Sequence, residues 1–235
     1  MTVLSKIRVL ATKPHDCSYL DDREATTLFV DPTLPIEQID YQELSDIGFR
    51  RSGRHYYRPH CATCNDCIAA RVPAATFSRS RRQQRVCKRN HDIIRKDVVS
   101  IDTDEHYRLY ETYIAAKHTN GDMFPATREQ YREFLVEHTG YTKYTEYRLA
   151  GELVAISIFD QMPYGLSAIY TAYSPQQSAR SLGNLVILDL IERAQQERLD
   201  FLYLGYWIRD CRKMTYKIDF RPVELLINGH WRTLS

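Results

Sequence analysis

The feature that most constrains the fold is a series of regularly patterned apolar segments after residue 103. Three segments with strand-like alternation precede a long amphipathic stretch, and two more apolar segments follow it. A period of two predicts strands, and apolar residues three and four apart predict helices. The segments predicted as strands are 144–149, 153–159, 166–173, 201–207 and 223–227. The segments predicted as helices are 105–116, 127–138 and 180–196.

Turn and cap residues support these boundaries. Ala150-Gly151 separates two predicted strands and Asn228-Gly229 follows the last one, as in two-residue hairpins. Thr127 and Gln130 have the spacing of a capping box at a helix start. We interpret the element order as β-β-β-α-β-α-β, which predicts an α/β (α+β) protein with a mixed sheet. An antiparallel meander leading into one crossover helix is also typical of the acetyltransferase-like (GNAT-like) fold.

The character of the chain changes near residue 98. Residues 1–98 hold five of the six cysteines and a strongly basic run, whereas residues 99–235 carry the periodic helices and strands. We therefore predict an N-terminal cysteine-cluster and basic region at 1–98, and an acetyltransferase-like domain at 99–235. No segment approaches the roughly 18 to 20 apolar residues of a membrane span. The N-terminal residues also lack the apolar core of a secretory signal, so we expect a cytoplasmic protein with no membrane partner.

The first region contains a C-x-x-C-x-x-C run, formed by Cys61, Cys64 and Cys67. Two-residue gaps in a tight loop bring thiolates toward one ion, and tetrahedral zinc needs a fourth ligand. Cys17 is the candidate for that ligand, with His60 and His15 in reserve. An iron–sulfur cluster uses the same kind of ligand. Redox-sensitive thiols and buried structural thiols are the alternatives to a zinc ion or cluster at these four cysteines.

The basic run lies between Arg71 and Lys96, where nine Lys or Arg residues accompany one acid, Asp92, for a local charge of +8. With a net charge of +2, the rest of the chain carries 2 − 8 = −6. Such an asymmetry favours a polyanionic partner, because guanidinium groups bind phosphate oxygens bidentately. A solvated helix face is the alternative, but acids that would pair with the arginines are almost absent. The candidate RNA-binding arginines are Arg79, Arg81, Arg82, Arg85 and Arg89.

Further motifs occur in order along almost the whole chain. In the N-terminal half they are Cys17-Ser-Tyr-Leu, Gly48-Phe-Arg-Arg-Ser-Gly, Tyr57-Arg-Pro, the cysteine run, Phe77-Ser-Arg-Ser-Arg-Arg-Gln and Arg89-Asn. In the C-terminal half they are Gly165-Leu-Ser-Ala-Ile-Tyr, Arg180-Ser-Leu-Gly, Tyr203-Leu-Gly-Tyr-Trp-Ile and Lys213-Met-Thr-Tyr-Lys through Phe220-Arg-Pro. Together these motifs resemble the bacterial leucyl-tRNA–protein transferases that act on N-terminal Asp and Glu, relatives of the eukaryotic arginyl-tRNA–protein transferases.

The resemblance implies an acetyltransferase-like fold, an aminoacyl-tRNA donor and protein acceptors with N-terminal Asp or Glu. The expected reaction transfers leucine to the acceptor's α-amine and so marks the protein for N-degron degradation. Arginine in place of leucine is an alternative donor amino acid. The donor is an activated ester, so positioning and oxyanion stabilisation suffice and no cofactor is required for the transfer.

We assign hypothetical roles to residues in these motifs. Arg180, Ser181 and Gly183 open a helix whose free N–H groups could bind the tRNA 3′ end. The acceptor's carboxylate needs a cation, and Tyr206, Tyr216 or Lys217 could relay a proton or position the amine. The candidate carboxylate-binding cations are Arg51, Lys213, Lys217 and Arg221. Structural roles for these residues are the alternative, in the core for the strand aromatics and at the surface for the lysines.

Two other functions fit parts of the sequence. A CoA-dependent N-acyltransferase would carry a glycine-rich pyrophosphate loop, of which the segment at 180–185 has only a part. A non-enzymatic RNA-binding module with a structural zinc would leave the C-terminal α/β part without a purpose. We therefore expect the aminoacyltransferase.

Overall fold

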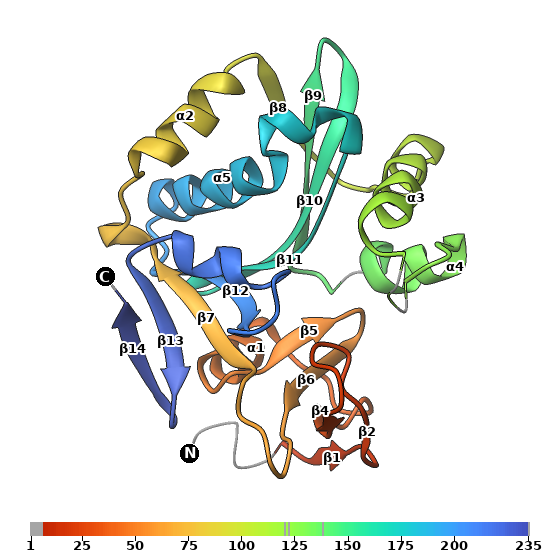
Figure 1. The fold of residues 1–235 in the computed structure, drawn as a ribbon, viewed down its shortest axis with the longest axis vertical. Coiled ribbons are helices and arrows are strands. Elements are labelled where there is room, and N and C mark those ends of the chain that lie inside the picture. Colours follow the sequence, from red (N-terminus) through yellow and green to blue (C-terminus); the bar gives the residue numbers. More distant parts are fainter. Residues whose placement is uncertain (1–6, 120, 122, 138, 235) are drawn as a thin grey trace.

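The computed structural model describes residues 7–119, 121, 123–137 and 139–234. Its largest element is an eight-stranded mixed sheet with the strand order β14-β13-β7-β12-β11-β10-β9-β8 (Figure 1). Neighbouring strands are antiparallel except for β11 and β12, which are parallel. The strands are β7 (Ile68–Pro73), β8 (Ile93–Val98), β9 (Thr142–Leu149), β10 (Glu152–Met162), β11 (Gly165–Tyr173), β12 (Phe201–Trp207), β13 (Val223–Ile227) and β14 (His230–Leu234). All five predicted strands are confirmed, and the mixed α/β class with them.

Both predicted hairpins are also confirmed. Ala150 and Gly151 connect β9 to β10 with φ values of 49° and 90°, and Asn228 and Gly229 connect β13 to β14 with 51° and 76°. Two consecutive positive φ values are the signature of a type I′ turn, whose twist matches that of the paired strands. Asn and Gly tolerate this backbone conformation best, so the Asn-Gly pair was a reliable signal.

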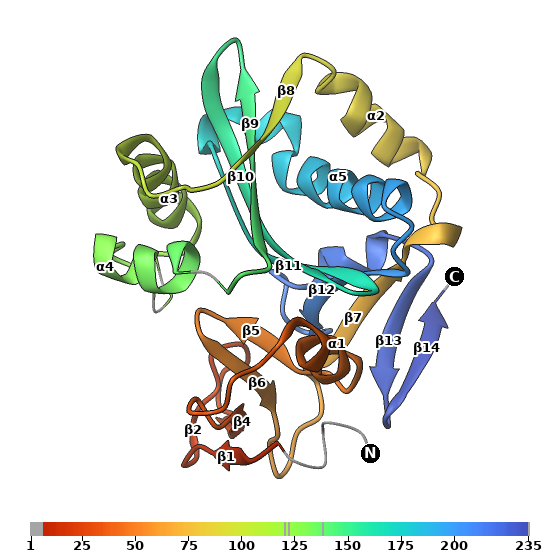
Figure 2. The same cartoon turned by 180° about the vertical axis from the view of Figure 1, so that it is seen from behind.

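Helices cover both faces of the sheet. Helices α2 (Arg81–Arg89) and α5 (Leu182–Gln196) lie on one face, and α3 (Asp104–Lys117) and the short α4 (Arg128–Tyr131) lie on the other (Figures 1 and 2). Helix α3 matches its predicted range within one residue at each end. Helix α5 begins two residues later than predicted, because a 3-10 segment, Pro175–Arg180, precedes it.

The predicted helix at 127–138 is confirmed as helical backbone through Val136, but its second half is of the π type. The Thr127 side chain caps the helix by accepting a hydrogen bond from the Gln130 N–H at 3.2 Å, as expected. The α-helical part then ends at Tyr131, and a π-type turn covers Arg132–Val136. The Tyr144 hydroxyl donates to the carbonyl groups of 135 and 136 (both 3.2 Å), which takes acceptors that a continuing helix would use. The predicted last residue, His138, lies outside the described residues.

The second helix of the predicted order β-β-β-α-β-α-β, which would lie between the strands 201–207 and 223–227, is wrong. That segment forms only a five-residue 3-10 helix, Thr215–Asp219. Pro222 follows closely, and a proline disfavours helical backbone in the residue before it and removes an N–H donor. Lys213 and Lys217 therefore do not share one face of a regular helix.

A second, four-stranded sheet packs below the large one (Figure 1). It contains β1 (Val9–Ala11), β4 (Thr27–Val30), β6 (His55–Pro59) and β5 (Arg50–Ser52), with α1 (Gln38–Asp46) beside it and a small ladder of β2 (His15–Asp16) and β3 (Glu24–Ala25). A buried cluster joins the two sheets through Tyr41, Tyr56, Tyr141, Met162 and Tyr203.

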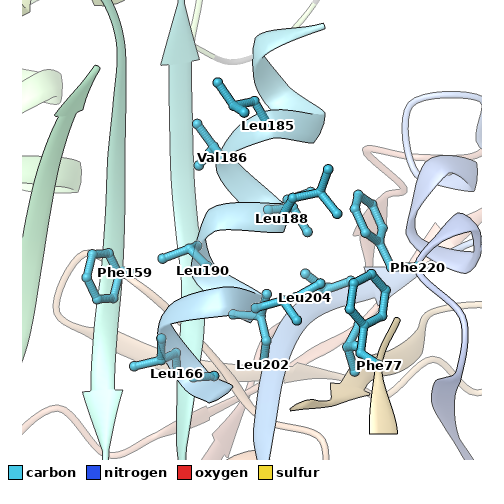
Figure 3. Close-up of a cluster of buried hydrophobic side chains, with 14 of the residues drawn as sticks. Phe77, Phe159, Leu166, Leu185, Val186, Leu188, Leu190, Leu202, Leu204 and Phe220 are labelled. Atoms are coloured by element: carbon cyan, nitrogen blue, oxygen red, sulfur yellow. The ribbon is translucent and has the colours of Figure 1, made fainter. Parts of the chain in front are cut away.

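The main hydrophobic core lies between α5 and the large sheet (Figure 3). Leu185, Val186, Leu188 and Leu190 of α5 pack on strand residues such as Leu202, and burial of each such side chain contributes about 1.5 to 3 kcal/mol. Strands β7 and β8 come from the first 98 residues, yet they belong to the same sheet as β9 to β14. The division at 98/99 stays a prediction.

Candidate functional site

The two parallel strands separate along the sheet. β11 pairs with β12 only from Gly165 to Ser167, opposite Phe201 to Tyr203. Among the described residues, no further pairs join the two strands, although β11 continues to Tyr173 and β12 to Trp207. Backbone N–H and C=O groups on the separated edges are therefore not used in a ladder between these strands. Gly205, with a φ of +79°, lies at a register shift in this part of β12.

Helix α5 begins where the strands have separated. Ser181 precedes it in the left-handed conformation, with a φ of 55°, and its hydroxyl caps none of the described N–H groups. The first N–H groups of a helix have no intrahelical partners, and they carry the positive end of the helix dipole. A Cβ on Gly183 would lie 3.4 Å from the Tyr173 ring, in ordinary van der Waals contact, so Gly183 lies directly beside that ring. The predicted anion-binding residues Ser181 and Gly183 thus lie together at the end of β11.

An aromatic group surrounds this helix start. Tyr113 of α3 packs on Tyr173 with ring centroids 4.7 Å apart, and on Tyr170 at 6.2 Å. The Tyr170 hydroxyl and the Trp207 Nε1 atom are buried and have no hydrogen-bond partner among the described residues. The sequence analysis missed Tyr113 and Tyr173, although Tyr173 ends the predicted strand directly before the helix.

The predicted RNA-binding arginines fall into two groups. Arg81, Arg82, Arg85 and Arg89 lie on the exposed side of α2, whose N-terminus is fixed by a capping box between Ser80 and Gln83. Arg79 instead donates to Glu192 of α5 at 2.9 Å, and it is half-buried. The exposed group is available to a polyanion, whereas Arg79 also holds two helices together.

Arg180 connects α2 to the start of α5. Its guanidinium donates to both carboxylate oxygens of Asp92, at 2.8 and 3.0 Å, and this ion pair lowers the pKa of Asp92. It also donates to the Arg89 carbonyl, while Asn90 donates to the Arg180 carbonyl at 2.9 Å. The exposed face of α2 and the open end of α5 are therefore held next to each other.

The predicted carboxylate-binding cations do not share one site. Arg51 is 5% exposed, and its Nε and Nη2 atoms donate to the two oxygens of Asp160 at 2.6 and 2.7 Å. An acceptor carboxylate would have to displace Asp160 to bind there. Lys213 and Arg221 lie at the exposed surface, and Arg221 donates to the Ile218 carbonyl.

Lys217 is the second buried residue among these cations. It is 5% exposed, and its Nζ donates to the Tyr206 carbonyl and contacts the Met214 sulfur at 3.1 Å. Burial and the nearby Arg50 guanidinium lower the pKa of Lys217 to about 7. Its amine therefore changes charge near neutral pH, which is unusual for lysine and typical of functional sites.

The two tyrosines proposed for catalysis lie in different settings. Tyr206 is buried and its hydroxyl donates to the Gly48 and Tyr57 carbonyls, at 2.8 and 3.1 Å, so it ties β12 to the small sheet. Burial raises its pKa well above the ordinary value. Tyr216 is 38% exposed, and desolvation of its hydroxyl still raises its pKa to about 12. At neutral pH neither is a base, and both roles stay predictions.

The cysteine run lies in the loop between β6 and β7, near Tyr206 and Lys217. Burial, followed by the thiols of Cys17, Cys61 and Cys64, raises the pKa of Cys67 to about 12, so the four side chains are near neighbours. Within the described ranges, no group of three or more His, Cys, Asp or Glu side chains is arranged to hold a metal ion. The zinc ion or iron–sulfur cluster stays a prediction.

Comparison with known proteins places the chain in a family. Residues 15–85 match the model described as "Arginine-tRNA-protein transferase, N terminus", and residues 105–227 match the corresponding C-terminal model. The chain therefore belongs to the arginine-tRNA-protein transferase family, a class of aminoacyl-transferring enzymes. Within that class it is 48% identical to proteins named aspartate/glutamate leucyltransferase from Pseudomonas fluorescens (strain Pf0-1) and Pseudomonas entomophila (strain L48), over the full length of each pair of chains.

A solved structure, L-PGS from Bacillus licheniformis, aligns with a TM-score of 0.48 and 13% identity over 72% of this chain and 50% of that chain. Among the described residues, no helix has both the length and the apolar character needed to cross a membrane.

Proposed function

We propose that this protein transfers leucine from leucyl-tRNA to the N-terminal α-amine of proteins that begin with Asp or Glu. The observation that carries the proposal is the full-length, 48% identical match to relatives named aspartate/glutamate leucyltransferase. The structure adds an exposed basic helix next to an open helix start, which suits a tRNA 3′ end. Leucine added in this way changes the N-terminal residue and marks the acceptor for degradation. Because charged tRNA is a cytoplasmic substrate, we place the reaction in the cytoplasm.

The donor binds in two places in this proposal. The exposed arginines of α2 contact phosphates of the tRNA, a sequence-independent attraction that depends on salt. The last nucleotide of the tRNA reaches the start of α5. The free N–H groups of the helix bind its phosphate, and the Tyr173 ring offers a surface on which its base stacks. The separation of β11 from β12 supports an acetyltransferase-like arrangement, in which the reacting group lies between the two strands.

The reaction balances without an added reagent. The neutral α-amine attacks the ester carbonyl, a C–N bond forms, and the C–O bond to the terminal ribose breaks. The amine proton leaves with the ribose oxygen or passes to water, so uncharged tRNA and a lengthened protein are the products. An α-amine has a pKa near 7.7 to 8, so about a tenth or more is neutral at pH 7. N–H groups on the separated strand edges are suited to bind the oxyanion that develops in the transition state.

Zinc or an iron–sulfur cluster at Cys17, Cys61, Cys64 and Cys67 remains part of the proposal as a structural feature. Thiolates at this spacing fit such a group chemically, and burial followed by the three neighbouring thiols raises the pKa of Cys67. Elemental analysis with an absorption spectrum after anaerobic purification tests it. A metal content of less than one ion or cluster per several protein chains would contradict this part of the proposal.

The test of the function uses purified protein, tRNA charged with labelled leucine, and peptides that begin with Asp, Glu, Asn or Ala. We expect labelled product with Asp and Glu only, and loss of transfer when the donor is treated with RNase. Arginyl-tRNA and labelled acetyl-CoA serve as the competing donors. Transfer from acetyl-CoA, or a preference for arginyl-tRNA, would replace this function with the corresponding alternative.

A further inference from the structure

Arg50 and Arg51 are adjacent in β5 and point to opposite faces of the small sheet, because strand side chains alternate. Arg51 faces Asp160 of β10 and uses the edge of its guanidinium formed by Nε and Nη2. Arg50 faces the rings of Tyr203 and Tyr206 in β12, with its Cζ atom 5.2 and 5.9 Å from their centroids. The two neighbours therefore offer the same chemical group to two different environments.

The Arg50 guanidinium is buried without a carboxylate. It is 4% exposed, and its Nη1 atom donates to the Ser45 and Phe49 carbonyls at 3.2 and 2.6 Å. Its Nε and Nη2 atoms have no hydrogen-bond partner among the described residues. These are the two atoms with which Arg51 holds Asp160. Leaving a buried charged donor unpaired is costly, which points to a ligand.

A second buried cation lies close to Arg50. Lys217 is near enough for the charge on Arg50 to act on its amine, and both residues contact Tyr206, one through its ring and one through its carbonyl. Arg50 carries a full charge and Lys217 a partial one near neutral pH, and among the described residues neither forms an ion pair with a carboxylate, so this interior site is positive. It lies beside the C-terminal part of β12, one of the strands that separate around the proposed reaction centre.

We propose that Arg50 binds the side-chain carboxylate of the acceptor's N-terminal Asp or Glu through its Nε and Nη2 atoms, and so determines the acceptor specificity. A planar fork matches the two oxygens of a carboxylate, whereas an Asn or Gln amide offers one acceptor and one donor. A neutral acceptor would leave part of the buried fork unpaired, and such mismatches discriminate strongly. This inference rests on the proposed function, and it replaces Arg51 as the first candidate for the role.

The experiment compares wild type with Arg50→Gln and Arg50→Lys on peptides that differ only in an N-terminal Asp or Asn. We expect Arg50→Gln to lower the ratio of kcat/KM for Asp over Asn by about 10- to 100-fold, since hydrogen bonds to charged groups have this size. The loss lies in KM for the Asp peptide, while KM for leucyl-tRNA is unchanged. Arg50→Lys keeps the charge without the fork and is expected to retain an intermediate ratio.

Arg58→Gln is the matched control. Arg58 lies on the neighbouring strand β6, stacks on Phe49 at 5.6 Å and donates to the Ile47 carbonyl, but it is only half-buried. Its substitution leaves the Asp-to-Asn ratio within about twofold of wild type. A folded Arg50→Gln protein with an unchanged ratio, or with equal losses for both peptides, would show a structural role and overturn the proposal.

A measurement on wild type covers the case in which the Arg50 variants do not fold. A peptide with N-terminal Asp and a photoreactive benzoylphenylalanine at its second position is irradiated with the protein, and the attachment site is mapped. We expect attachment within residues 48–52 or 203–217, and competition by the dipeptide Asp-Ala but not by Asn-Ala. Attachment confined to other segments overturns the inference. Absence of leucine transfer by wild type would instead refute the proposed function, which separates the two failures.

Discussion

Positive charge occurs in two regions of this protein with opposite physical settings. On α2 the guanidinium groups are exposed, and within the described ranges their one ion pair joins Arg82 to Asp219 at 3.8 Å. Around β5 and the 3-10 helix at 215–219, three cations are each 5% exposed or less: Arg50, Arg51 and Lys217. Exposed charges attract a polyanion over a distance and are screened by salt. Buried charges are screened much less by salt, and each buried donor without a partner has a large desolvation cost.

The difference teaches how one enzyme can handle two acidic substrates. A tRNA presents many similar phosphates, for which a flexible, exposed array suffices. An acceptor protein presents one carboxylate that must be distinguished from an isosteric amide, and only a desolvated, oriented fork does this. In the proposed function, the same residue type attracts the tRNA in one region and selects the acceptor in the other.

The strongest test of this contrast is the buried pair. Arg51→Met leaves Asp160 as a buried carboxylate without its main partner, and should lower the free energy of unfolding by about 3 to 5 kcal/mol in urea titrations. Because replacing a whole buried pair by apolar residues is close to neutral, the double variant Arg51→Met/Asp160→Leu should recover most of that loss. A stable Arg51→Met protein that no longer distinguishes Asp from Asn would assign the acceptor carboxylate to Arg51 after all.

The exposed region is tested by charge reversal on α2. The variant Arg81→Glu/Arg82→Glu/Arg85→Glu should raise KM for leucyl-tRNA by about 10- to 100-fold near 0.15 M salt and reduce the salt dependence of binding. Stability and KM for the acceptor peptide should change little, because these side chains lie at the surface.

Its matched control reverses three exposed cations in the loops of the N-terminal part, Lys13, Arg23 and Arg54, none of which lies on α2. If the control raises KM for tRNA as much as the α2 variant does, the effect is one of net charge and α2 has no special part.

The smallest effect concerns the titration of Lys217. Its pKa falls from 10.5 when unfolded to about 7 when folded, so between these values the unfolded chain binds more protons. The free energy of unfolding therefore rises with pH in this window, by up to about 1.4 kcal/mol per pH unit from this residue. We expect wild type to gain stability relative to Lys217→Met between pH 7 and 9, measured by urea unfolding. Parallel pH profiles for the two proteins would show that Lys217 titrates normally.

Local sequence signals predicted most of the C-terminal fold. The Asn228-Gly229 pair, the Thr127 cap and the alternation of apolar residues in β10 and β12 are all short-range features with a direct backbone consequence. The failures occurred where distant groups intervene. The Tyr144 hydroxyl takes the carbonyl groups of 135 and 136, which would otherwise extend the helix beyond Val136, and no local pattern reveals this competition.

The sequence showed which residue types are available for the candidate site, but not how they are arranged in space. The run 79–89 was correctly identified as a basic segment, but the sequence did not show that Arg79 binds Glu192, 113 residues away. The motif at 48–53 directed attention to Arg51, whereas its neighbour carries the unpaired guanidinium edge. Which of two adjacent arginines meets a carboxylate depends on the strand's orientation in the assembled fold.

The sequence by itself determined the family, the mixed α/β class, the basic run and the residue types available for holding tRNA and an acidic acceptor. Periodicity, turn residues and ordered motifs are local properties, so they can be recognised in the sequence without the tertiary structure. Only the tertiary structure decided which cations are paired, buried or exposed, because that depends on partners such as Asp160, 109 residues from Arg51. A guanidinium that is paired with a carboxylate stabilises the fold, whereas one without such a partner is available to bind a ligand.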